Sequence, residues 1–187
     1  MRLGALEAGG TKMVCAIGDE NGNVFERMSF PTRMPEETMP GIINYFRERP
    51  VEALGISSFG PLNLNKQDPN FGDITTTPKP GWQNYPLLRT LAAALNVPVG
   101  IDTDVNGAAL AEARLGAGRG LDSLVYYTIG TGVGGGAVVE GRLLHGLVHP
   151  EMGHMLLRPC KDDPAPHGFC PYHDGCLEGM ATGVAIE

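Results

Sequence analysis

The sequence has few aromatic side chains, few basic residues and no long apolar run. Of its 187 residues 6% are aromatic, and 14 Lys and Arg face 21 Asp and Glu, which gives a net charge of −7. This charge repels nucleic-acid backbones and anionic membranes on average. The N-terminal residues also lack the apolar core of a secretory signal. We therefore expect a cytoplasmic protein that binds neither nucleic acid nor membrane and keeps its cysteines reduced.

The 42% of hydrophobic residues suffices for a core, and their spacing predicts an α/β lobe in the first part of the chain. Three strands are followed by helix, strand, helix, strand and helix, an order typical of an α/β sandwich. In the first helix Met39, Ile42 and Phe46 share one face, with Thr38 as the expected N-terminal cap. The predicted strands cover 3–7, 11–17, 23–30, 51–57 and 97–102, and the later helices cover 85–96 and 105–115.

After a glycine-rich joint the same order of elements begins again. The second series consists of a strand at 123–129, a glycine turn at 131–136, a strand at 137–139 and a tight turn into 142–144. This repetition predicts duplicated α/β lobes. We expect the first lobe over residues 1–118 and the start of the second over residues 119–187.

Two glycine turns stand at equivalent places in the two series, EAGGTK at 7–12 and GTGVGGG at 130–136. Peptide N–H groups in such turns can converge on phosphate oxygens, and Thr11 and Thr131 add hydroxyl donors. The first turn lacks P-loop spacing, and the second is followed by a strand where a dinucleotide fingerprint needs a helix. Each turn alone could be a plain β-hairpin, but their repetition favours phosphate binding.

The segment from His149 to Glu178 is rich in histidine and cysteine at short spacings. Thiolates and imidazoles are typical zinc ligands in tetrahedral structural sites. Cys170, His173 and Cys176 form the tightest group, and a fourth ligand must come from upstream. The alternatives are a disulfide between Cys170 and Cys176 or histidines on a polar loop, but the interleaved pattern favours metal, with zinc as the default.

A carboxylate pair lies where the strand at 97–102 gives way to a helix. Ligands of α/β folds bind at the carboxyl ends of strands, and Asp104 could accept a proton from a hydroxyl there. The alternative is that these aspartates only cap the helix, a role that we assign to Asp102.

Together these motifs resemble the ROK family of sugar kinases and sugar-responsive repressors, within the actin-like (ribonuclease H-like) ATPase superfamily. EAGGTK and a histidine among the metal ligands look most like the bacterial fructokinase branch. The matching segments, in family order, are EAGGTK at 7–12, Gly60-Pro61, DVN at 104–106, GTGVGGG at 130–136, EMGH at 151–154 and CPYHDGCLE at 170–178.

The resemblance implies ATP-dependent phosphorylation of a hexose, most simply fructose at its 6-hydroxyl, with Asp104 as general base and the sugar between the lobes. The implied sugar-binding residues are Gly60, Asn106, Glu151 and Glu178. The implied phosphate-binding residues are Gly10, Thr11, Lys12, Thr131 and Gly132, with Mg²⁺ bridging the ATP phosphates. The implied ligands of a structural zinc are His154, Cys170, His173 and Cys176, and a homodimer is implied for the full-length protein.

The sequence departs from the family pattern in three places. Thr103 stands where many relatives have asparagine, and Glu7 replaces the usual aspartate. Family members continue past Glu187, so we expect a fragment with an incomplete second lobe that is inactive alone. The alternative functions are a glucokinase, mannokinase or N-acetylmannosamine kinase, a sugar-sensing regulator and a bare zinc-binding module. A regulator is disfavoured because we expect no room for a DNA-reading motif before the first strand. A zinc-binding module is disfavoured because it leaves both glycine turns unexplained.

Overall fold

The computed structural model describes residues 1–146 and 149–187, which form two compact units. The first unit contains Met1–Gly107 and His149, and the second contains Ala108–Gly146 and Pro150–Glu187. The division falls within helix α3 (Asp104–Arg114), whereas the sequence pattern placed it after residue 118. No helix among the described residues is long and apolar enough to cross a membrane.

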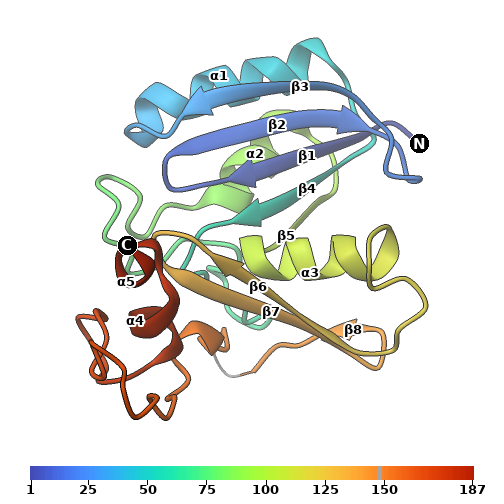
Figure 1. Cartoon of the computed structure of the whole chain (residues 1–187). Coiled ribbons are helices and arrows are strands. Elements are labelled where there is room, and N and C mark those ends of the chain that lie inside the picture. The colour runs from blue at the N-terminus through green and yellow to red at the C-terminus, as the bar shows by residue number, and fades with distance from the viewer. Residues whose placement is uncertain (147–148) are drawn as a thin grey trace. The chain divides into compact units, whose positions relative to one another are not determined.

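A five-stranded mixed sheet in the order β3-β2-β1-β4-β5 forms the first unit (Figure 1). Strands β1, β4 and β5 are parallel, β2 pairs antiparallel with β1, and β3 pairs antiparallel with β2. The predicted order of strands and helices is confirmed. The strands are β1 (Leu3–Ala8), β2 (Lys12–Gly18), β3 (Val24–Pro31), β4 (Ala53–Ser58) and β5 (Val99–Thr103).

Helices α1 (Pro35–Glu48) and α2 (Leu87–Leu95) also contribute buried side chains to the core of this unit. Alternate residues of β1, β2 and β4 are buried, as expected for strands that pack one face on a core. The buried side chains include Leu6, Met13, Ile56, Phe46 and Leu91.

The predicted cap of the first helix was wrong. Helix α1 begins at Pro35, where the missing N–H of proline costs no helical hydrogen bond. Thr38 therefore lies inside the helix, and its hydroxyl accepts the N–H of Arg33 at 3.0 Å. The residue ties the preceding segment to the helix instead of starting it.

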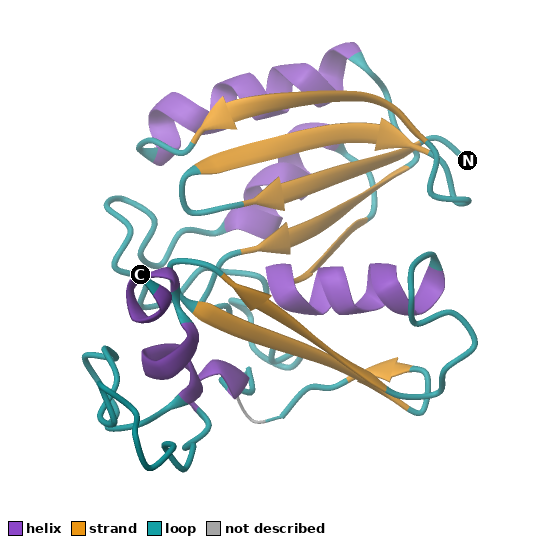
Figure 2. Cartoon of the chain, viewed as in Figure 1, coloured by secondary structure: helices purple, strands orange, loops and turns teal. Residues whose placement is uncertain are grey.

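The second unit contains an antiparallel meander of β6 (Leu124–Ile129), β7 (Val133–Val139) and β8 (Arg142–Leu143), drawn as orange arrows in Figure 2. It repeats the strand meander that opens the chain, as predicted. The second glycine turn is shorter than predicted, because Gly134 to Gly136 pair with β6 as part of β7. A Cβ at Gly135 would lie 2.7 Å from the Cβ of Met152, so glycine here admits the short helix η1 (Met152–His154) against the strand.

Candidate functional site

The predicted site residues of the first unit gather at the carboxyl edge of its parallel strands. Ala8 at the end of β1 is aligned with Ser58 at the end of β4, and Ser58 with Thr103 at the end of β5. The segments that follow these ends contain Gly10, Gly60 and Asp104 respectively. This edge is where α/β folds bind their ligands.

The turn between β1 and β2 directs its carbonyl groups to donors within the protein. The carbonyl of Gly9 accepts the hydroxyl of Thr32 at 2.7 Å, and that of Thr11 accepts the N–H of Thr32 at 3.0 Å. The carbonyl of Gly10 accepts the ammonium group of Lys79. In the part of the chain that the structure describes, the N–H groups of Gly10 and Thr11 donate to no protein acceptor. Both residues are exposed, so these two N–H groups are accessible to an anion.

The two glycines of this turn meet different surroundings. A Cβ at Gly9 would lie 2.6 Å from the carbonyl oxygen of Lys12, so the closure of the turn requires glycine there. A Cβ at Gly10 would meet nothing within 4 Å. The fold therefore does not need glycine at position 10, which leaves the approach of a ligand as a reason for it.

At the start of α3, the structure changes the role expected for Asp102. The helix begins at Asp104, and the hydroxyl of Thr103 accepts the N–H of Asn106 at 3.3 Å, which is the hydrogen bond of an N-terminal cap. Asp102 instead accepts the side-chain amide of Asn106 at 2.8 Å. The prediction that Asp102 caps the helix was wrong, because the shorter Thr103 side chain already occupies the capping position.

Asn106 is fully buried, and the bond that its side-chain N–H donates to Asp102 fixes the orientation of its amide, because the amide nitrogen must face the carboxyl oxygen. Among the residues that the structure describes, none donates a hydrogen bond to the buried Oδ1 atom of Asn106. A buried acceptor of this kind is costly unless a donor reaches it. Asp104, by contrast, is exposed at the first position of the helix.

In the second unit the turn between β6 and β7 is bonded to the C-terminal helices. Thr131 and Gly132 are exposed in this turn. Glu178, in α4 (Leu177–Ala181), accepts the N–H of Val133 with its Oε2 atom at 3.0 Å. A Cβ at Gly132 would lie 3.0 Å from the same oxygen, and the N–H of Gly183, in α5 (Gly183–Ile186), donates to the carbonyl of Gly130 at 3.0 Å.

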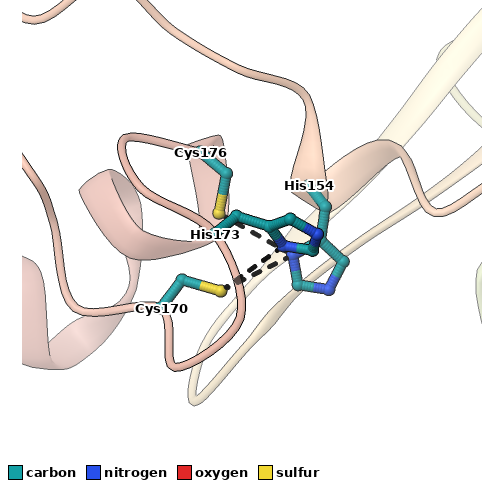
Figure 3. Close-up of side chains that lie close together, drawn as sticks. All are labelled: His154, Cys170, His173 and Cys176. Carbon is teal, nitrogen blue, oxygen red and sulfur yellow. Dashed lines mark hydrogen bonds between the residues drawn. The ribbon is translucent and has the colours of Figure 1, made fainter.

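A candidate metal site lies beside this turn and consists of two imidazoles and two thiols (Figure 3). The ligand atoms of His154, Cys170, His173 and Cys176 all lie within 4.8 Å of one another. The Sγ of Cys170 is 3.8 Å from the Nδ1 of both histidines, and the Sγ of Cys176 is 3.7 Å from the Nδ1 of His154. All four cysteines of the chain are free, so the alternative disulfide between Cys170 and Cys176 is not formed.

These distances fit the geometry of a tetrahedral zinc site. Zinc–sulfur bonds of about 2.3 Å and zinc–nitrogen bonds of about 2.0 Å place neighbouring sulfur and nitrogen ligands about 3.6 Å apart. Cys160 and His167 are not among the four clustered residues, and His167 contacts Asp174 at 2.8 Å instead. The structure therefore brings together the set of ligands that the resemblance implied.

The segment from His154 to Cys176, which holds the four candidate metal ligands, is joined to both predicted acidic sugar ligands. Glu151 directly precedes η1, and its carbonyl accepts the N–H of His154 at 3.0 Å. Leu156 forms a β-bridge with Cys176, which lies directly before α4 and Glu178. A metal held by His154 and Cys176 would thus fix the start of α4, the helix that contains Glu178.

Sequence reasoning missed three contacts of these turns, which involve Thr32, Lys79 and the bond from Val133 to Glu178. Each joins residues more than twenty positions apart, so no local spacing reports it. The only signal for Lys79 is its place between two prolines just before the single tryptophan, Trp82.

Comparison with known proteins gives consistent matches. The model of the ROK family matches residues 3–187. A fructokinase of Pediococcus pentosaceus is 49% identical over 186 residues, which cover 100% of this chain and 64% of that protein. A crystal structure of a ROK hexokinase from Thermus thermophilus matches with a TM-score of 0.79 and 34% identity, over 100% of this chain and 62% of that one.

A ROK family glucokinase from Streptomyces griseus, crystallised with glucose and AMPPNP, matches with a TM-score of 0.77 and 29% identity, over 100% of this chain and 59% of that one. The chain thus spans about 60% of the length of the proteins it matches. These matches confirm the α/β fold of the actin-like ATPases that the sequence predicted. Since the family model extends over all but the first two residues, the chain belongs to the ROK family.

Proposed function

We propose that the whole protein is an ATP-dependent fructokinase, which transfers the terminal phosphate of ATP to the 6-hydroxyl of fructose. The similarity to the Pediococcus pentosaceus fructokinase over the entire chain carries this proposal. The carboxyl edge of the parallel strands supports it, because that edge combines an exposed carboxylate, a buried amide acceptor and a turn with two accessible N–H groups.

In this proposal Asp104 is the general base that accepts the proton of the attacking hydroxyl. Its exposure at the start of α3 leaves the carboxylate accessible to a substrate. Asn106 and Gly60 bind the sugar from the same edge, and a sugar hydroxyl would supply the donor that the Oδ1 atom of Asn106 lacks. Glu151 and Glu178 are the proposed sugar ligands of the second unit.

Gly10, Thr11 and Lys12 in the first unit, and Thr131 and Gly132 in the second, are the proposed contacts of the ATP phosphates. Phosphoryl transfer depends on positioning and on compensation of the phosphate charge. Mg²⁺, as the partner of ATP, would supply part of that compensation when bound. The chain contributes peptide N–H groups, hydroxyls and the ammonium of Lys12.

We further propose that the candidate metal site holds structural zinc. All four ligands come from the protein, which is typical of structural rather than catalytic zinc sites. The site would therefore do no chemistry and would instead fix the loop between η1 and α4.

A panel of hexoses with coupled detection of ADP tests the proposal, using the whole protein with Mg²⁺ and ATP. We expect fructose to give the highest kcat/KM. Glucose, mannose and N-acetylmannosamine are the competing substrates, and glucose is favoured among them by the similarity to the Streptomyces griseus glucokinase. Turnover of none of these sugars would refute the kinase assignment. Gel filtration with light scattering tests the homodimer that we propose for the full-length protein.

A further inference from the structure

Lys79 lies far from the first glycine turn in sequence but contacts it in the structure. Its Nζ atom donates to the carbonyl of Gly10, 69 residues away. In the described part of the chain, Lys79 takes part in no ion pair. Its positive charge therefore stands at the turn without a carboxylate partner, in a protein whose net charge is −7.

The backbone of Lys79 is held by a buried anchor. Its carbonyl accepts the N–H of Trp82 at 3.2 Å, and its own N–H donates to the hydroxyl of Thr77 at 3.3 Å. Trp82 is fully buried, and its indole N–H donates to the carbonyl of Arg33 at 2.7 Å. The ring also packs edge-on against Phe59, the residue after β4. This anchoring fixes the place from which the lysine side chain reaches the turn.

The turn itself is arranged to receive negative charge. The carbonyl groups of Gly9 and Thr11 are bonded to Thr32, and that of Gly10 is bonded to Lys79. The N–H groups of Gly10 and Thr11 have no protein acceptor among the described residues. A polyphosphate that extends along this turn could meet the N–H groups of Gly10 and Thr11 and, across the Gly10–Thr11 peptide, the ammonium group of Lys79. An ammonium has three donor hydrogens, so Lys79 can keep its bond to Gly10 and still bind a phosphate oxygen.

We propose that Lys79 binds the terminal phosphates of the nucleoside triphosphate substrate. This inference rests on the proposed kinase function, because it places the ATP phosphates at the turn that contains Gly10. The compact ammonium group of Lys79 would compensate phosphate charge at this turn. It comes from a segment that is not part of either glycine motif. The competing explanation is that Lys79 only ties its own loop to the turn.

Isothermal titration of the whole protein with ATP, inorganic tripolyphosphate and AMP tests the inference. The variants are Lys79→Met, Lys79→Arg and, as a matched control, Lys66→Met, which removes an exposed lysine from the same long loop. We expect Lys79→Met to weaken the binding of ATP and tripolyphosphate about 10-fold or more, as for the loss of a charged hydrogen bond. AMP binding should be unchanged, Lys79→Arg should retain most of the affinity, and Lys66→Met should behave as wild type.

The outcomes separate this inference from the proposed function. Equal binding of tripolyphosphate by Lys79→Met and Lys66→Met would overturn the role of Lys79 and leave the kinase proposal intact. An equal loss of AMP and ATP affinity would show that the substitution disturbs the turn as a whole, and would also overturn a direct contact. Wild-type protein that binds neither ATP nor tripolyphosphate would refute the proposed function itself, and the inference with it.

Discussion

Removal of one ligand of the candidate metal site should release the metal and loosen the loop that it closes. Between η1 and α4 the chain has no helix or strand, and an isolated bridge joins Leu156 to Cys176. His154 and Cys170 are 16 residues apart, so a metal that binds both closes a loop of about that length. The corresponding cross-link in a disulfide stabilises a protein by about 3 kcal/mol, mainly by restricting the unfolded chain. We expect a loss of that order in Cys170→Ser.

The assay combines zinc content with thermal unfolding. Wild-type protein should contain one zinc per chain, and Cys170→Ser or His154→Ala should contain far less. A loss of about 3 kcal/mol corresponds to a fall in Tm of roughly 6–12 °C for a domain of this size. A chelator should lower the Tm of wild type by a similar amount and should change the Tm of Cys170→Ser little.

Two residues of the same loop provide matched controls. Cys160→Ser and His167→Ala remove one thiol and one imidazole that are not part of the cluster. The ring of His167 contacts the exposed Asp174, and exposed ion pairs contribute little to stability. Both variants should keep the zinc content and the Tm of wild type. The argument is refuted if Cys160→Ser loses as much zinc as Cys170→Ser, or if purified wild type cannot be loaded with zinc.

Four further predictions concern residues of the sites and of the core. Asp104→Asn should lower kcat about 10²- to 10⁴-fold in a coupled assay of the whole protein, with zinc content unchanged, whereas unchanged turnover would exclude Asp104 as the base. Gly10→Ala should keep the Tm of wild type, because its Cβ would meet no atom within 4 Å, and should weaken ATP binding at the turn. Gly153→Ala should cost about 1–3 kcal/mol in chemical denaturation, because its Cβ would lie 1.8 Å from the carbonyl oxygen of Val133. Burial raises the pKa of Cys15 to about 12, so this thiol should react with a thiol reagent at pH 8 only after unfolding. The exposed Cys160 should react first, and Cys170 and Cys176 should follow after chelation. Early reaction of Cys15 would contradict its burial.

The order of elements could be predicted because each strand and helix carries its own periodicity. The errors fall at the boundaries of elements. Thr38 has the side chain of a cap, but Pro35 begins the helix three residues earlier. Gly134 to Gly136 look like a turn in the sequence, yet they pair with β6 as part of β7, and a Cβ at Gly135 would meet Met152 of η1.

The cluster of candidate metal ligands could be predicted because three of the four residues lie within seven positions, so short-range spacing carries most of the information. His154 followed from the resemblance rather than from spacing. The contacts of the two glycine turns could not be predicted, because Lys79 and Glu178 each reach a turn from a distant segment. A side-chain bond between segments that far apart depends on the packing of the whole unit and leaves no periodic trace.

The bond between Glu178 and Val133 gives the metal site a further consequence within the second unit. Cys176 is a proposed metal ligand directly before α4, and Glu178 lies in the first turn of that helix. Because Glu178 accepts the amide N–H that follows Gly132, a shift of α4 would also disturb the second glycine turn. A metal that fixes Cys176 therefore stabilises a proposed sugar ligand and a proposed phosphate-binding turn at once. Loss of the metal should then weaken the binding of both substrates, which a merely local role in the loop would not do.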